Sequence, residues 1–359
     1  MTLQKTKTIT PSGSGSFGGP LFVVGMWRSG TSLLYALLNQ HPDVALLYEG
    51  DLALLTPLFW TAKPKADWQQ RWDFWNQALT RHQIDQARIP SVVAGFADAM
   101  SSVGREYARG KGASIWGCKS PNYYDCMTGL SREFPDARFI VIWRDPADIC
   151  RSIVRAAEDP SWFRKIGLPH RALFGYHEMK KECDQLMGAG VPVHEIEYEE
   201  LTHNPAGVMV DVCAFLGVPF EERMLSLEGA DRSAIYPGEH HKLVKSEKIV
   251  VAKERAEILP PSLRRKIGRY VQLWQREFAG HWPRVRQSSE PQPGEPNLLE
   301  RCVDRVWYRT LRGLDFVVTI AFSFAPLILL KKYRDLKQQR ELTREMRENV
   351  TRPASSQAD

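Results

Sequence analysis

Short apolar runs alternate with amphipathic segments between residue 21 and residue 216. Four of these runs are rich in β-branched and aromatic residues, which favours strands buried inside a parallel sheet. They cover residues 21–24, 114–119, 137–143 and 191–198. Leucines recur at helical spacing over residues 33–38, and residues 177–187 and 205–216 are also predicted helices. This alternation predicts an α/β fold with a doubly wound parallel sheet, whose ligands bind at the carboxyl ends of the strands.

The segment between residues 52 and 110 has the pattern of a helical insertion in such a fold. Trp68, Trp72 and Trp75 are spaced so that they share one face of a helix. An aromatic stripe of this kind belongs either to the hydrophobic core or to the wall of an acceptor pocket, and the sequence leaves both interpretations open.

The two ends of the chain differ in composition from its body. Residues 1–20 are polar, rich in glycine and serine, and contain no apolar stretch of the kind found in a signal peptide. We therefore expect a disordered tail and a cytoplasmic protein. Residues 287–296 (QSSEPQPGEP) have the composition of a linker. The predicted organisation is one domain over residues 21–286, the linker, and a helical extension over residues 297–359.

The extension contains an uncharged apolar segment, residues 316–330 (FVVTIAFSFAPLILL). It is shorter than the roughly 20 residues that a spanning helix needs, and Pro326 interrupts it. Aromatic and basic residues flank it on both sides, WYRTLR before it and KKYR after it. Such anchors indicate peripheral contact with the cytoplasmic face of a membrane through residues 314–334. A buried core helix or an oligomer contact would give the same apolar pattern.

Charge and cysteine content exclude several classes of protein. Lys and Arg number 48 against 42 for Asp and Glu, and the resulting net charge of +6 is too small to indicate a nucleic-acid binder. The six cysteines are scattered without a C-x-x-C pair, and no His, Cys and Asp cluster has the spacing of metal ligands. We therefore expect reduced thiols, no metal site and no nucleic-acid partner, whereas a small anionic ligand agrees with the charge.

The strongest local signal is the sequence GMWRSGTS, residues 25–32, between the first strand and the first helix. A loop in this place directs its backbone N–H groups, and the positive end of the helix, at a bound anion. The residues of this cradle are Ser29, Gly30, Thr31 and Ser32. The G-x-x-x-x-G spacing is that of a nucleoside-triphosphate P-loop, but Thr31 occupies the position of its lysine. Arg28, inside the loop, has a planar group that can bind two oxygens of a phosphate or sulfate.

A second basic site follows the predicted strand 137–143. Arg144 comes directly after this strand, at the sheet edge where ligands bind, and Ser152 lies in the next predicted helix. A guanidinium group and a hydroxyl group so placed can hold a second, separate phosphate. Arg144 could instead form an ordinary ion pair with Asp145.

Four stretches of the sequence together resemble the sulfotransferases that use 3′-phosphoadenosine 5′-phosphosulfate (PAPS). The loop for the 5′-phosphosulfate is similar to PLFVVGMWRSGTSLLYALLNQHPDV, and the 3′-phosphate motif is similar to RFIVIWRDPADICRSIV. GCKSPNYYD is similar to the strand and turn of that family that bring a lysine to the sulfate. HEIEYEELTHNPAGVMVDVCAFLGVPF is similar to a strand and helix that follow further along the family's sequence. The resemblance covers residues 20 to 225. It is closer to the bacterial, tyrosyl and glycan branches than to the aryl type, because Arg28 stands where aryl-type enzymes have lysine.

The resemblance implies roles for the binding residues. The backbone of residues 29–32 would hold the 5′-phosphate, and Arg144 and Ser152 would hold the 3′-phosphate. Arg28 and Lys119 would neutralise the leaving phosphate and the sulfate oxygens, so that no metal is needed. Lys119 could instead be a solvated lysine at the end of a strand.

The resemblance also implies a general base. Glu49, in HPDVALLYEGD, matches the position of the base in the tyrosyl branch, although the residues around it differ. Glu49 could instead be a loop carboxylate that pairs with Arg28, and Asp51 and Asp125 are the alternative bases.

These roles imply an enzyme that transfers the sulfuryl group of PAPS in line to an acceptor hydroxyl, or to an amine, and releases adenosine 3′,5′-bisphosphate. The apolar extension favours a lipid or membrane-presented acceptor. Two other functions stay open. One is a P-loop kinase for a nucleoside or small molecule that uses ATP and Mg²⁺, and the other is a catalytically silent membrane-associated scaffold of the same fold.

Overall fold

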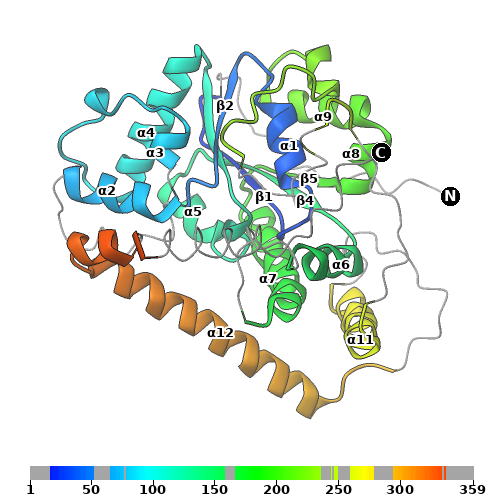
Figure 1. The fold of residues 1–359 in the computed structure, drawn as a ribbon. Coiled ribbons are helices and arrows are strands. Elements are labelled where there is room, and N and C mark those ends of the chain that lie inside the picture. The colour runs from blue at the N-terminus through cyan, green and yellow to red at the C-terminus, as the bar shows by residue number, and fades with distance from the viewer. Residues whose placement is uncertain are drawn as a thin grey trace, which may run out of the picture.

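The computed structural model describes residues 17–51, 65–76, 78–157, 166–235, 244, 246–249, 259–278, 294–333 and 335–336. Within these residues, five parallel strands form one sheet in the order β2-β3-β1-β4-β5, and helices cover both of its faces (Figure 1). The strands are β1 (Leu21–Val24), β2 (Val44–Tyr48), β3 (Ile115–Lys119), β4 (Arg138–Trp143) and β5 (Val193–Glu197). The predicted doubly wound α/β fold is confirmed.

The helices connect these strands and pack on the two faces. They are α1 (Thr31–Leu38), α2 (Lys65–Asn76), α3 (Ala78–Arg81), α4 (Phe96–Lys111), α5 (Met127–Glu133), α6 (Pro146–Ala156), α7 (Leu168–Gly188), α8 (Tyr198–His203), α9 (Pro205–Leu216), α11 (Pro261–Glu277) and α12 (Leu298–Phe324). Short 3-10 turns cover Gln86–Arg88, Pro121–Tyr123 and Glu222–Leu225. Helices α1, α8 and α9 share one hydrophobic core with the sheet, and α4 to α7 share the other.

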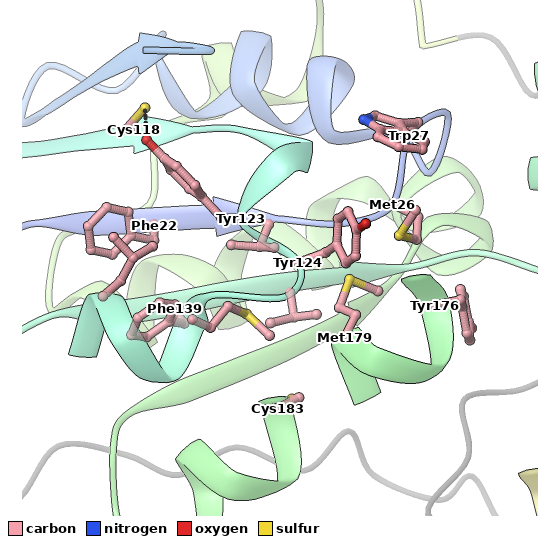
Figure 2. Packing of buried hydrophobic residues seen from close by; sticks show 14 of the residues in the cluster. Phe22, Met26, Trp27, Cys118, Tyr123, Tyr124, Phe139, Tyr176, Met179 and Cys183 are labelled. Atoms are coloured by element: carbon pink, nitrogen blue, oxygen red, sulfur yellow. Dashed lines mark hydrogen bonds between the residues drawn. The ribbon is translucent and has the colours of Figure 1, made fainter. Parts of the chain in front are cut away.

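The central strand β1 explains why the buried strands appear as unbroken apolar runs. Its side chains alternate between the two cores, with Phe22 on one side and Leu21 on the other, so every position is buried. Phe22 stacks on Phe139 of β4 at 5.3 Å between ring centroids and meets the ring edge of Tyr123 at 5.7 Å (Figure 2). These contacts hold β1 rigidly behind the loop that follows it.

Two boundaries differ from the sequence predictions. Strand β2, with the sequence VALLY, was not among the four predicted strands, although all five of its residues are buried. Residues 17–20, which we assigned to the tail, lie against the sheet: Pro20 O accepts a hydrogen bond from Arg138 N at 3.2 Å, and the Arg138 guanidinium lies 4.1 Å from the Phe17 ring centroid. The ordered domain therefore begins no later than Phe17.

Two tryptophans of the predicted stripe on α2 lie in the hydrophobic core. Trp68 and Trp72 are fully buried on α2 and belong to the core that covers the α4 to α7 face. The core interpretation therefore holds for these two residues. The side chain of Trp75 and most of the predicted linker, up to residue 293, lie outside the described residues.

The C-terminal extension begins with the long helix α12, which packs against the domain through the buried Tyr308 and Leu311. It ends at Phe324, just before Pro326, and a second helical segment, Leu327–Tyr333, follows at an angle of 118°. Across the described part of the chain, no single helix is long and apolar enough to cross a membrane; only this bent pair meets the criterion, by length and composition alone. Because Phe316 and Val317 are 54% and 62% exposed, the alternative of a buried core helix is wrong.

Candidate active site

The residues predicted for the site lie along one edge of the sheet. All five strands are parallel, so their carboxyl ends share that edge. Glu49 follows β2, Lys119 ends β3, and Arg144 follows β4, while the loop 25–30 connects β1 to α1. The sheet therefore brings together residues that are more than a hundred positions apart in the sequence.

The loop after β1 has the backbone conformation of an anion cradle. Helix α1 begins directly after Gly30, and no side chain caps its first N–H groups. Gly30 has φ +103°, and a Cβ at this position would lie 2.3 Å from a ring carbon of Tyr198, so both the conformation and the space require glycine. The Ser29 hydroxyl is buried and has no hydrogen-bond partner in the described residues. A buried hydroxyl without a protein partner is costly, so the Ser29 hydroxyl is suited to donate to a bound anion.

Arg28 joins this loop to the second predicted anion site. Its Nε donates to Ser152 Oγ at 3.0 Å, and Arg144 Nη1 donates to the backbone oxygen of Arg28 at 2.9 Å. Burial and the neighbouring Arg144 charge lower the pKa of Arg28 to about 10. The Arg144 guanidinium lies 4.3 Å above the Tyr198 ring, and its buried Nε has no hydrogen-bond partner in the part of the chain described. Arg28 thus lies with the residues predicted for the 3′-phosphate.

Lys119 and Glu49 form an ion pair at the other side of the loop. Lys119 Nζ donates to Glu49 Oε1 at 2.7 Å and to Ser32 Oγ at 3.3 Å, and it lies 4.0 Å from the centroid of the Tyr48 ring. The side chain of Lys119 is 1% exposed, so the interpretation as a solvated lysine is wrong. Burial lowers the pKa of Lys119, and the carboxylate of Glu49 opposes this effect.

The loop that carries Glu49 is held in an unusual conformation. Glu49 and Asp51 have φ values of +49° and +34°, which cost non-glycine residues about 1–3 kcal/mol each and persist only where the surroundings impose them. Trp72 Nε1 donates to the oxygen of Gly50 at 2.5 Å, and Asn122 donates to Asp51 at 2.8 Å. Trp72 of α2 and Asn122 therefore fix the loop in this conformation.

The two alternative bases are already engaged by other groups. Asp51 accepts hydrogen bonds from Ser120 and Asn122, and burial, followed by the nearby Glu49, raises its pKa to about 6. Asp125 pairs with Arg312 of α12. The side chains of Glu49 and Asp125 are 19% and 18% exposed, so Glu49 differs from Asp125 by its pairing with Lys119 and not by its accessibility.

Sequence reasoning missed two aromatic residues that shape the site. Tyr48 lies beneath Lys119, and its hydroxyl is 2.8 Å from Ser32 Oγ. Tyr198 supports Arg144 and closes the space next to Gly30. The apolar run VALLY directly before Glu49 was the signal that could have placed Tyr48 at the end of a strand. In the described residues, no group of three or more His, Cys, Asp and Glu side chains could hold a metal ion.

A sequence model described as "Sulfotransferase family" matches residues 20–222, which is more than half of the chain. The chain belongs to the sulfotransferase family. The match covers all five strands and every predicted site residue.

Individual relatives of this sulfotransferase-family protein are distant. Protein-tyrosine sulfotransferase 1 of Danio rerio is 27% identical over 214 residues, 58% of this chain and 56% of that protein. Protein-tyrosine sulfotransferase A of Caenorhabditis elegans is 25% identical over 215 residues, 58% of this chain and 52% of that protein. The chain therefore spans about half the length of these curated relatives. The sulfotransferase domain of the Synechococcus PCC 7002 olefin synthase superimposes with a TM-score of 0.48 at 21% identity, over 76% of this chain and 99% of that one.

Proposed function

We propose that this protein transfers the sulfuryl group of PAPS to an acceptor hydroxyl and releases adenosine 3′,5′-bisphosphate. The observation that carries the proposal is the cluster that Arg28 of the loop 25–30 forms with Arg144 and Ser152. Two guanidinium groups held this close repel each other, and a bound phosphate would relieve the repulsion that contributes to the lowered pKa of Arg28. The buried Ser29 hydroxyl and Arg144 Nε, both without partners in the described residues, suit a ligand that supplies acceptor oxygens.

The proposal assigns the two phosphate groups of the nucleotide to neighbouring strand ends. The N–H groups of residues 29–32, at the positive end of α1, bind the 5′-phosphate. Arg144 and Ser152 bind the 3′-phosphate and so distinguish PAPS from ATP, which lacks that group. Arg28 lies between the two positions and offers its charge to both.

Lys119 and Glu49 perform the transfer in this proposal. The acceptor oxygen attacks sulfur while the bond between sulfur and the 5′-phosphate oxygen breaks, and the bisphosphate leaves with the electron pair. Lys119 stabilises the charge on the sulfuryl and leaving oxygens, and Glu49 takes the proton of the hydroxyl. The products are a sulfate ester, the bisphosphate and a protonated Glu49. In-line geometry is inferred by analogy with phosphoryl transfer, where the protein mainly positions groups and stabilises charge.

A hydroxyl acceptor is favoured over an amine by the names of the relatives, which are protein-tyrosine sulfotransferases. The position of Glu49 agrees with this acceptor. A hydroxyl must lose its proton as it attacks, and in this proposal the carboxylate of Glu49, which pairs with Lys119, receives that proton.

Calorimetric titration with adenosine 3′,5′-bisphosphate in EDTA tests the proposal without an acceptor. Arg144→Ala should weaken binding by about 30- to 900-fold, because a truncated charged contact costs about 2–4 kcal/mol. Binding of adenosine 5′-monophosphate, which has no 3′-phosphate, should not respond. Arg138→Ala is the matched control: Arg138 starts the same strand, donates to the oxygen of Phe215 at 2.7 Å and also lies over an aromatic ring, but it sits at the opposite sheet edge.

Three results would overturn the proposal. Equal losses for both arginine variants would show that the effect is structural. Preference for ADP, or binding only after Mg²⁺ is added, would favour the kinase. Tight bisphosphate binding without turnover of PAPS in the presence of hydroxyl acceptors would favour the silent scaffold.

A further inference from the structure

An exposed apolar stripe runs along α12 on the side turned away from the domain. Its members recur every three or four residues or at double that spacing, and they are between 44% and 73% exposed: Leu299, Val303, Val306, Leu314, Val317 and Phe324. Figure 1 shows α12 along the outer side of the molecule, from near α11 to near α2. A helix whose apolar residues repeat on its solvent side lacks a partner for that side.

The charges of α12 are divided between its two sides. Its three carboxylates all pair with residues of the domain: Glu300 with Arg269, Asp304 with Lys266, and Asp315 with Arg171. Arg301, Arg305 and Arg309 repeat every four residues, are exposed, and have no side-chain partner among the residues described. The outer side of α12 is therefore apolar with a positive edge and carries no free carboxylate.

We propose that this stripe binds the surface of an anionic membrane, with α12 lying in the plane of that surface. Apolar side chains enter the boundary of the acyl chains, and arginines at the edge attract acidic headgroups, each contributing about 1 kcal/mol. Trp307 and Tyr333, 44% and 53% exposed, are amphipathic residues suited to that interface. The buried Tyr308 and Leu311 tie the opposite side of α12 to the domain, so the helix lies on the membrane rather than across it.

The charge distribution favours a lipid surface over a second copy of the chain. Two copies packed stripe to stripe would bring six arginines to the contact, three from each helix, and no unpaired carboxylate of α12 to meet them. An anionic bilayer meets both features of the stripe at once, because it offers an apolar interior beneath a negative surface.

Two contacts connect α12 to the proposed catalytic edge. Arg71 of α2 donates to the oxygen of Phe322 in α12 at 3.3 Å and to that of Ala325, directly after the helix, at 2.6 Å. Its neighbour Trp72 holds the loop that carries Glu49. On the other side, the hydroxyl groups of Tyr308 and Tyr124 are 3.3 Å apart, and the Tyr124 ring meets the ring of Trp27 in the phosphate loop at 5.9 Å. A bound membrane would thus lie on the side of the molecule that holds the site. An acceptor presented by that membrane follows only if the proposed function is right.

Flotation of the full-length protein with lipid vesicles tests the binding itself. The wild-type protein should float with phosphatidylcholine vesicles that contain phosphatidylserine and should bind vesicles of phosphatidylcholine alone more weakly. The double substitution Val306→Asp/Val317→Asp should lower the partition coefficient by about 10- to 100-fold. Arg305→Glu/Arg309→Glu should remove the preference for phosphatidylserine.

The double substitution Val92→Asp/Val210→Asp is the matched control, because these valines are 76% and 46% exposed outside α12. It should leave flotation unchanged. The inference is overturned if wild-type protein does not bind anionic vesicles, or if the control reduces binding as much as the stripe variant does. A different result would assign the stripe to a second copy of the chain. In that case the wild-type protein sediments as a dimer, the stripe variant sediments as a monomer, and neither binds vesicles. Bisphosphate binding, measured in the same variants, reports on the proposed function separately.

Discussion

The buried lysine at the end of β3 offers a sharp test of the proposed chemistry, because the chain contains a matched buried lysine to which the proposal gives no role. Lys119 is 1% exposed, pairs with Glu49 and lies 4.0 Å from the centroid of the Tyr48 ring. Lys180 on α7 is also 1% exposed, pairs with Asp184 and lies 5.3 Å from the ring centroid of Phe278. Both can be replaced by methionine, which keeps the length and the apolar stem and removes the charge.

The two substitutions should cost similar amounts of stability. Breaking a buried ion pair from one side costs about 3–5 kcal/mol when the remaining charge stays dry. The partners here are partly hydrated, since Glu49 and Asp184 are 19% and 40% exposed, so we expect about 1–2 kcal/mol for each variant after this discount.

The effect on turnover should separate the two lysines. A unit charge about 4 Å from the charge that develops on the transferred group contributes roughly 4 kcal/mol at an effective dielectric constant of about 20. Removing one such group typically lowers kcat by about 10²–10³-fold. We therefore predict a loss of this size for Lys119→Met and a change below about 2-fold for Lys180→Met, with partial rescue by Lys119→Arg.

Release of bisphosphate from PAPS in the presence of a phenolic acceptor, corrected for the folded fraction at each temperature, measures this difference. Equal losses in the two variants would mean that a buried lysine matters only for folding. Full activity in Lys119→Met would remove Lys119 from the mechanism.

Two further predictions concern the loops of the site, one through the Asp51 carboxyl group and one through the conformation of Gly30. Burial raises the pKa of Asp51 to about 6, so its proton stabilises the fold at low pH and this stabilisation is lost as the pH rises from about 4 through 6. Between pH 4 and pH 8 the free energy of unfolding of Asp51→Asn should rise by about 2 kcal/mol relative to wild type in urea unfolding, and a pH-independent difference would contradict this. Gly30→Ala should lose about 2–5 kcal/mol, because φ is +103° and the new Cβ would meet Tyr198, whereas Gly112→Ala, with φ +68° and open space, should lose only about 1–2 kcal/mol in thermal unfolding.

The sequence predicted which residues lie at the ends of the strands, but it did not predict which of these residues contact one another. Lys119 and Arg144 could be placed at the binding edge because each follows an apolar run, and parallel strands end at one edge. The ion pair between Lys119 and Glu49 could not be predicted, since it depends on which strands are adjacent. In the sheet, β2 lies beside β3 with Tyr48 opposite Lys119, and this register brings Glu49 to the lysine. The hydrophobic pattern of each strand does not determine which strands lie next to one another in the folded sheet.

Periodicity also shows which residues share a face but not what that face contacts. The tryptophans of α2 and the valines of α12 both repeat at helical spacing, yet Trp68 is fully buried and Val317 is 62% exposed. The indole of Trp72 on α2 donates a hydrogen bond to the oxygen of Gly50, whereas the outer side of α12 faces solvent. Only the tertiary contacts distinguish these two cases.

The contacts of α12 determine how its role has to be tested. Deleting residues 297–359 is the obvious experiment from the sequence, where this segment resembles a detachable extension. In the structure, the buried Arg171 donates to Asp315 at 2.5 Å and to the oxygen of Leu311 at 3.1 Å, and Arg312 neutralises Asp125. Deletion would leave a buried guanidinium group and a partly buried carboxylate without these partners, at a cost of several kcal/mol. A truncated protein would therefore lose both the stripe and part of the stability of the domain, and a loss of vesicle binding would not distinguish these two causes. Substitutions on the outer side of α12 change only the stripe.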